Sequence, residues 1–155
     1  MDPKFMKLAI EEAKKGMAAG DGGPFGAVIV KDGQVIGAGH NMVLVTKDPT
    51  AHAEVTAIRN TCKNVDSFDL SNCQLYTSCY PCPMCMGAAL WSRVDAIYYG
   101  ATSSDAAEIG FGDHEFHEFL QNPKSDEKRQ LEQFKVDNYL EPFQIWAKKD
   151  DKTPY

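Results

Sequence analysis

The sequence predicts one α/β domain over residues 1–155, a three-layer α/β/α sandwich around a mixed sheet of roughly five strands. Two observations carry this prediction. Apolar residues recur with helical and with strand periods in alternation, which favours a sheet covered by helices on both faces. An early hairpin adds antiparallel strands to that sheet, so we expect it to be mixed. A chain of 155 residues with 43% hydrophobic residues can fill one core.

The N-terminal segment predicts a helix. Asp2 and Pro3 are typical of a helix start, and Gly20 is typical of a helix end. Between them, apolar residues recur at helical spacing: Phe5, Leu8, Ala9, Ala13 and Met17. We expect this apolar face to cover the sheet.

A β-hairpin is predicted next. Residues 27–30 and 35–38 are rich in β-branched and small apolar residues. Asp32 and Gly33 lie between them, and an Asp-Gly pair adopts the positive φ angles of a two-residue turn. The two strands should therefore pair directly.

A second helix is expected from Thr50, as its N-cap, through Lys63. Its apolar stripe comprises Val55, Ile58 and Cys62. His52 and Glu54 would then lie in the first turn, at the positive end of the helix dipole.

Residues 74–77 predict a short strand that leads into a cysteine cluster. Pro83 is tolerated just inside a helix start, and the apolar pattern continues to about Arg93. Cys82 and Cys85 are three residues apart, so their side chains should point the same way. The helix dipole favours thiolates at both positions.

The last third of the chain predicts two further strands and two short helices. Residues 94–99 are interpreted as a buried strand that ends at Gly100. The elements beyond it are, in order, a loop at 110–113 that enters a short helix, a polar connection at 122–129, a strand at 134–136 that would complete the sheet, and a helix opening at Pro142.

The charge of the chain argues against nucleic-acid binding. It has 22 acidic and 16 basic residues and a formal net charge of −6, which disfavours a surface that follows a phosphate backbone. A small-molecule partner fits better. Residues 1–5 lack the apolar core of a signal peptide, and no apolar run approaches the ~18 residues of a membrane span. We therefore expect a cytoplasmic protein without a membrane segment.

His52, Cys82 and Cys85 predict a zinc site. One imidazole and two thiolates supply three ligands of a tetrahedral zinc, whose fourth position is left for a water with a pKa lowered towards about 7. Glu54 is a carboxylate that this ligand set does not need, and it is placed to accept and return the water's proton. The pattern indicates catalysis, with one Zn²⁺ per chain.

A structural zinc is the main alternative. Cys79 would then join His52, Cys82 and Cys85 and close the site, which would make the protein a zinc-stabilised binding module. A closed site has no use for Glu54, however, and Cys79 lies across a strand-to-helix junction from the other cysteines. A redox pair of Cys79 and Cys82 is disfavoured by the competing cysteine three residues later.

Other candidate residues have two interpretations each. Asn41 fits an ordinary turn, but its place eleven residues before His52 favours a site role. Trp91 is a core residue by default and otherwise one wall of a pocket for a flat ring. Asp113 begins a solvated helix on the simplest interpretation. The remaining histidines lack partners at ligand spacing and are expected to be solvated or hydrogen-bonded: His40, His114 and His117.

These motifs resemble the cytidine deaminase superfamily over nearly the whole chain. A His-x-Glu followed by Pro-Cys-x-x-Cys is the signature of zinc-dependent nucleobase deaminases. The chain is most similar to the small bacterial guanine deaminases in residues 22–28, 48–54, 82–85, 142–146 and the final Tyr155. The tRNA adenosine deaminases share residues 48–54 but usually carry a basic C-terminal helix.

The resemblance implies a substrate and a set of site residues. The reaction would convert guanine, a small purine base, to xanthine and ammonia; guanosine, cytosine, an aminotriazine or a tRNA adenosine are the alternative substrates. Glu54 would be the catalytic proton shuttle and Asp113 would assist proton delivery to the leaving amine. The residues implied in binding the base are Phe25, Asn41, the backbone of Ala53, Trp91 and Tyr155.

The resemblance also implies a homodimer. In the family, the C-terminal segment, here about residues 130–155, is exchanged between subunits. Tyr155 would then enter the active site of the partner subunit.

Overall fold

The computed structural model describes residues 1–154, and the chain divides into two compact units, Met1–His114 and Glu115–Tyr155. The first unit holds the sheet and the candidate site. The expectation of one domain over the whole chain stays a prediction.

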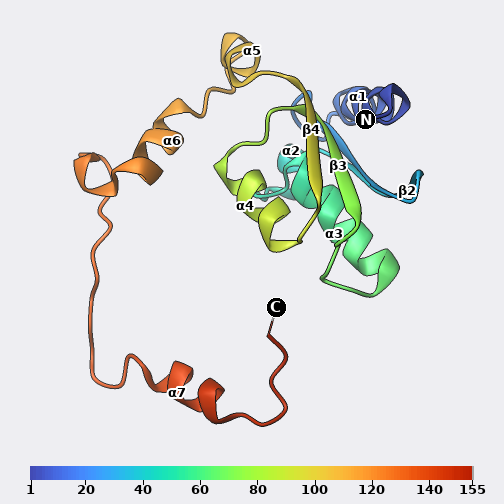
Figure 1. The fold of residues 1–155 in the computed structure, drawn as a ribbon. Helices are drawn as coiled ribbons and strands as arrows, with labels where there is room; N and C mark the ends of the chain where they lie inside the picture. Colours follow the sequence, from blue (N-terminus) through green and yellow to red (C-terminus); the bar gives the residue numbers. More distant parts are fainter. Residues whose placement is uncertain (155) are drawn as a thin grey trace. The chain divides into compact units, whose positions relative to one another are not determined.

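A four-stranded mixed sheet forms the centre of the first unit (Figure 1). Its strands, in the order β2-β1-β3-β4, are β1 (Gly26–Lys31), β2 (Gln34–His40), β3 (Cys73–Cys79) and β4 (Ala96–Ala101). β1 pairs antiparallel with both of its neighbours, whereas β3 and β4 are parallel. The mixed sheet is confirmed.

The prediction of a fifth strand is wrong. Residues 134–136 form no strand; Phe134 is 88% exposed and Val136 is 56% exposed. An alternating three-residue pattern is compatible with a strand, but a strand needs a hydrogen-bonded neighbour, and no described segment pairs with this one. Within residues 1–154 the sheet ends at β4, which continues through Gly100 and is only partly covered, as expected of an edge strand.

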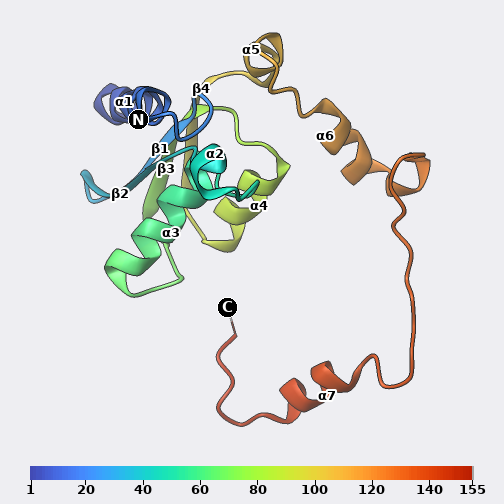
Figure 2. The ribbon, with the colours of Figure 1, turned by 180° about the vertical axis from the view of Figure 1, so that it is seen from behind.

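Helices cover both faces of the sheet (Figures 1 and 2). On one face, α1 (Pro3–Ala19) packs Phe5 against Val28 and Val30 of β1. On the other, α3 (Ala53–Val65) and α4 (Pro83–Trp91) lie over Ala27 and Ile29 of the same strand. Successive residues of a strand point to opposite faces, so one short apolar strand supplies both cores. The three-layer prediction is confirmed.

The first helix and the hairpin follow their sequence signals. Asp2 caps α1 by accepting a hydrogen bond from the Lys4 backbone N–H at 2.9 Å, and the helix ends at Gly20. Asp32 and Gly33 have φ angles of 49° and 75°, as the tight turn requires. The ends of the helix and the hairpin turn are confirmed. The expected apolar face is confirmed only in part, because Phe5, Ala9 and Ala13 are buried, whereas Leu8 and Met17 are 44% and 47% exposed.

Two short helices were not expected: α2 (Val43–Thr46) and α5 (Ser103–Glu108). The second had a signal, because Thr102 and Asp105 form a reciprocal capping box at its start. A Thr-x-x-Asp pattern is visible in the sequence.

The second unit contains short helices joined by irregular segments. They are α6 (His114–Gln121), which begins at the unit boundary, the 3₁₀ turn η1 (Pro123–Ser125) and α7 (Glu141–Lys148). Glu115 pairs with Lys128 and Arg129 at 3.2 and 3.3 Å. No helix within residues 1–154 is both long and apolar enough to cross a membrane.

Candidate metal centre and active site

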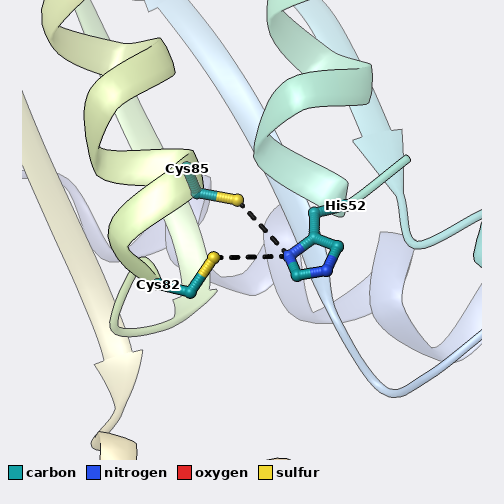
Figure 3. Close-up of side chains that lie close together, drawn as sticks. All are labelled: His52, Cys82 and Cys85. Carbon is teal, nitrogen blue, oxygen red and sulfur yellow. Dashed lines mark hydrogen bonds between the residues drawn. The ribbon is translucent and has the colours of Figure 1, made fainter. Parts of the chain in front are cut away.

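Two helix N-termini bring the three predicted ligands together (Figure 3). His52 is the N-cap of α3, and Cys82 is the N-cap of α4. Nδ1 of His52 lies 3.5 Å from Sγ of both Cys82 and Cys85. Among residues 1–154, this is the one group of three metal-binding side chains found, with ligand atoms all within 4.8 Å of one another.

The start of α3 differs from the expected one. Thr50 is not its N-cap, because its backbone N–H and its hydroxyl both donate to Oδ1 of Asp48, at 2.8 and 2.7 Å. The helix therefore begins at Ala53, with His52 as N-cap. Neither His52 nor Cys82 makes the usual side-chain capping bond, so both side chains are available to a metal.

The geometry fits zinc. Typical zinc bonds to imidazole nitrogen and thiolate sulfur, meeting at the tetrahedral angle, place the two ligand atoms about 3.6 Å apart. The two 3.5 Å separations between His52 and the cysteines agree with that value. Two thiolates and one imidazole are also a donor set typical of zinc. The residues present therefore fit the metal that the sequence predicts.

The ligands influence one another's protonation. A hydrogen bond from Cys85 lowers the pKa of Cys82 to about 4, and the same contact raises the pKa of Cys85. The hydrogen bond with Cys82 raises the pKa of His52. Because thiolates are the forms that bind zinc, metal binding has to release any proton that the raised pKa keeps on Cys85.

Glu54 lies beside the ligands in a buried position. It is 6% exposed, and the hydroxyl of Thr77 donates to its Oε1 at 3.2 Å. Burial raises the pKa of the Glu54 carboxyl, although a hydrogen bond from Cys85 acts in the opposite direction. A carboxyl with a raised pKa suits proton transfer near neutral pH. Thr77 was not singled out in the sequence, and a threonine in a strand carries no signal of such a role.

Cys79 is not part of the ligand group. Its thiol donates to the backbone oxygen of Thr102 at 3.6 Å, and the metal-binding group does not include it. Burial raises the pKa of Cys79, and the nearby carboxylates of Glu54 and Asp113 raise it further. This arrangement disfavours the closed structural site and the redox pair. It also shows that Asp113 and Glu54 both lie close enough to Cys79 to affect its pKa.

Asn41 follows β2 and Phe25 precedes β1, and the backbone N–H of Asn41 donates to the backbone oxygen of Phe25 at 3.0 Å. Asn41 is 5% exposed, and its Oδ1 accepts hydrogen bonds from the backbone N–H groups of Gly23 at 3.3 Å and Val43 at 3.2 Å. The Phe25 ring packs edge-to-face on Phe111, with centroids 5.0 Å apart. Phe111 was not anticipated. Ala53, whose backbone is a predicted base contact, is the first residue of α3 and follows the predicted zinc ligand His52 directly.

The other predicted site residues are not all brought together. Trp91 is the last residue of α4, about 12 Å along the helix axis from its start beside Cys82, and it is 69% exposed. Asp113 is partly buried and precedes α6. Tyr155 lies outside the described residues. The base contacts of Trp91 and Tyr155 stay predictions.

Comparison with known proteins gives consistent matches. Residues 1–101 match the family model for the cytidine and deoxycytidylate deaminase zinc-binding region. The chain is 48% identical to the guanine deaminase of Bacillus subtilis over 151 residues, which cover 97% of each protein. It is 43% identical to a tRNA-specific adenosine deaminase of Haemophilus influenzae over 122 residues, 78% of this chain and 70% of that protein.

Solved structures agree. The crystal structure of guanine deaminase from Bacillus subtilis has a TM-score of 0.95 at 47% identity, covering 100% of this chain and 99% of that one. The structure of guanine deaminase from Nitrosomonas europaea has a TM-score of 0.67 at 37% identity, covering 70% of this chain and 63% of that one.

Proposed function

The chain belongs to the cytidine and deoxycytidylate deaminase family, and on that premise we propose that it is a zinc-dependent guanine deaminase. The observation that carries the proposal is the meeting of His52, Cys82 and Cys85 beside a buried carboxylate, Glu54, which is not part of this group of three ligands. The near full-length similarity to a guanine deaminase supports the substrate. We expect one zinc per chain, which one set of three ligands provides.

The roles of the residues follow from their positions. Zinc, when bound by His52, Cys82 and Cys85, supplies a Lewis acid that makes a water nucleophilic near neutral pH. Glu54 accepts that water's proton and returns it towards the amine that leaves the base. Thr77 holds the Glu54 carboxylate by donating to Oε1. Asn41 has Oδ1 occupied by backbone N–H groups, so its Nδ2 is the side-chain group left to donate to the base.

The test of the proposed function is ammonia release by zinc-loaded protein. Guanine, guanosine, adenine, cytosine and the aminotriazine ammeline form the panel. We expect guanine to give the highest kcat/KM, with xanthine as the product. Ammonia release from cytosine or guanosine alone would assign another substrate. Ammonia release from none of the compounds would favour a zinc-stabilised binding module instead of an enzyme.

Asp113 is proposed to assist the leaving amine. Asp113→Asn is expected to lower kcat by about 10²-fold with little change in KM, because an amide cannot deliver the proton. Steady-state kinetics with guanine measures this. Glu115→Gln is the matched control, since Glu115 lies two residues away and pairs with Lys128 and Arg129 on the surface. Equal kinetics for both variants and the wild type would reduce Asp113 to a solvated helix start.

We also propose a homodimer in which residues 130–155 are exchanged. Support comes from large apolar side chains that are exposed in this segment: Leu131 63%, Phe134 88%, Phe143 73% and Ile145 63%. Exposed apolar groups gathered on one segment are typical of a protein interface. Exchange between identical subunits is a common way to form such an interface. Separately, we propose that the protein is cytoplasmic.

The C-terminal residues 152–155 are proposed to cap the base in the active site, and their removal tests this role. We expect zinc content and the melting temperature to be retained while kcat/KM falls by about tenfold or more, because the tail would cap the reacting base. An unchanged kcat/KM would refute the cap. If activity is lost, mixing with a zinc-free Cys82→Ala full-length chain is expected to restore part of it under exchange. Absence of rescue after the subunits are shown to remix would mean that each tail serves its own chain.

A further inference from the structure

A partly buried histidine lies next to the proposed base-binding asparagine and takes no part in the chemistry described above. His40 is the last residue of β2, and its side chain is 13% exposed. Nε2 of the ring lies 2.8 Å from Oδ2 of Asp21, and Nδ1 lies 3.4 Å from Oε2 of Glu12 on α1. An ionised carboxylate only accepts hydrogen bonds, so the ring nitrogen facing Asp21 donates.

Asp21 is a junction between two parts of the fold. Its backbone N–H donates to Gly16 of α1 at 3.0 Å. Its backbone oxygen accepts from Leu44 and Val45 of α2 at 2.9 and 3.2 Å. The bond from His40 therefore ties the end of β2 to the residue that connects α1 and α2.

The turn after Asp21 holds the Asn41 amide. Gly23 donates its backbone N–H to Oδ1 of Asn41, and Val43 donates to the same oxygen. The fit is tight: a Cβ at Gly22 would lie 2.1 Å from Oδ1. A movement of residues 21–23 by a few tenths of an ångström would thus move the amide.

We propose that His40 is a positioning residue for substrate binding: by holding Asp21, it fixes the turn that makes Asn41 present Nδ2, a donor, to the base. The inference rests on the proposed function, in which Asn41 contacts the purine. It implies selection for a ring that offers a carbonyl oxygen or an unprotonated ring nitrogen to Asn41, and discrimination against a ring that offers an amino group there.

Replacing His40 by glutamine or by asparagine tests its two hydrogen bonds, to Asp21 and to Glu12, one at a time. Glutamine places its amide nitrogen near the position of Nε2, whereas asparagine places it near that of Nδ1. His40→Gln therefore keeps a donor towards Asp21, and His40→Asn keeps one towards Glu12. If the bond to Asp21 holds the turn, the first variant should resemble the wild type and the second should not.

Kinetics with guanine is the first measurement. We expect His40→Asn to raise KM about tenfold with kcat within about twofold, and His40→Gln to keep KM within about twofold, since a misplaced binding group affects KM more than kcat. In an Asn41→Ala background, His40→Asn should have no further effect on KM, because the two residues act as one unit. Equal damage in both His40 variants, or independent effects of His40 and Asn41, would overturn the inference.

The second measurement needs no turnover. The side-chain amide signals of Asn41 in a heteronuclear NMR spectrum, assigned by their loss in Asn41→Ala, should be preserved in His40→Gln and shifted or broadened in His40→Asn. Unchanged signals in His40→Asn would overturn the inference even if the wild type deaminates guanine. A wild type that releases no ammonia from guanine, with the NMR signals behaving as expected, would instead overturn the proposed function and leave the positioning of Asn41 supported.

Discussion

Replacement of Glu54 by glutamine is expected to remove nearly all turnover while zinc stays bound. The amide has almost the same shape, and its oxygen still accepts the hydrogen bond from Thr77, which lies 3.2 Å from Oε1 in the native chain. It cannot accept a proton from water. General acid–base catalysis is typically worth ~10²–10⁴-fold, and we expect a loss in kcat of at least that size.

The measurement is single-turnover and steady-state ammonia release at matched zinc content. Thr77→Val is a second, milder variant, because it removes the hydrogen-bond donor to Glu54 and keeps the volume of the side chain. Its effect should be smaller than that of Glu54→Gln. A metal-loaded Glu54→Gln protein with near-normal kcat would exclude Glu54 as the proton shuttle.

Replacement of Cys82 or Cys85 by alanine should abolish both zinc binding and activity. Two remaining ligands cannot hold a tetrahedral zinc at low metal concentration. Metal analysis after dialysis is expected to give about one equivalent of zinc for the wild type and little for either variant.

Cys79→Ser is the matched control for these two variants. Its thiol bonds to the Thr102 backbone oxygen, so the serine should retain zinc and turnover. Loss of zinc in this control, or full zinc in both alanine variants, would show that the zinc is held by a different set of ligands.

The sequence predicted those parts of the fold whose signals are local. Asp2, Pro3 and Gly20 mark both ends of α1, and Asp32 with Gly33 marks the hairpin. The meeting of His52, Cys82 and Cys85 was also predictable, because metal binding requires particular side chains at fixed spacing. For the helix and the hairpin, the deciding interaction lies within a few residues of the signal, whereas His52 and the two cysteines are 30 and 33 positions apart and are brought together by the fold.

Features that depend on competition or on distant partners were missed. Thr50 has the right chemistry for an N-cap, but its backbone N–H and hydroxyl donate to the side chain of Asp48, and helix α3 begins at Ala53 with His52 as its N-cap. Residues 134–136 alternate as a strand does, yet a strand depends on a neighbour that three residues do not specify. The hydrogen bonds of His40 and Thr77 join residues 19 and 23 positions apart and leave no pattern in the sequence.

The absence of capping bonds at His52 and Cys82 has a consequence for folding. His52 and Cys82 stand at the starts of α3 and α4 and make no side-chain capping bond, so a zinc held by both would tie the two helix starts together and couple metal binding to folding. A ligand that prefers the folded chain stabilises it by about 1.4 kcal/mol for each tenfold increase in its free concentration above Kd. The lifetime of this protein in a cell should therefore follow the availability of zinc, and scarcity of the metal would reduce the amount of folded enzyme as well as its activity.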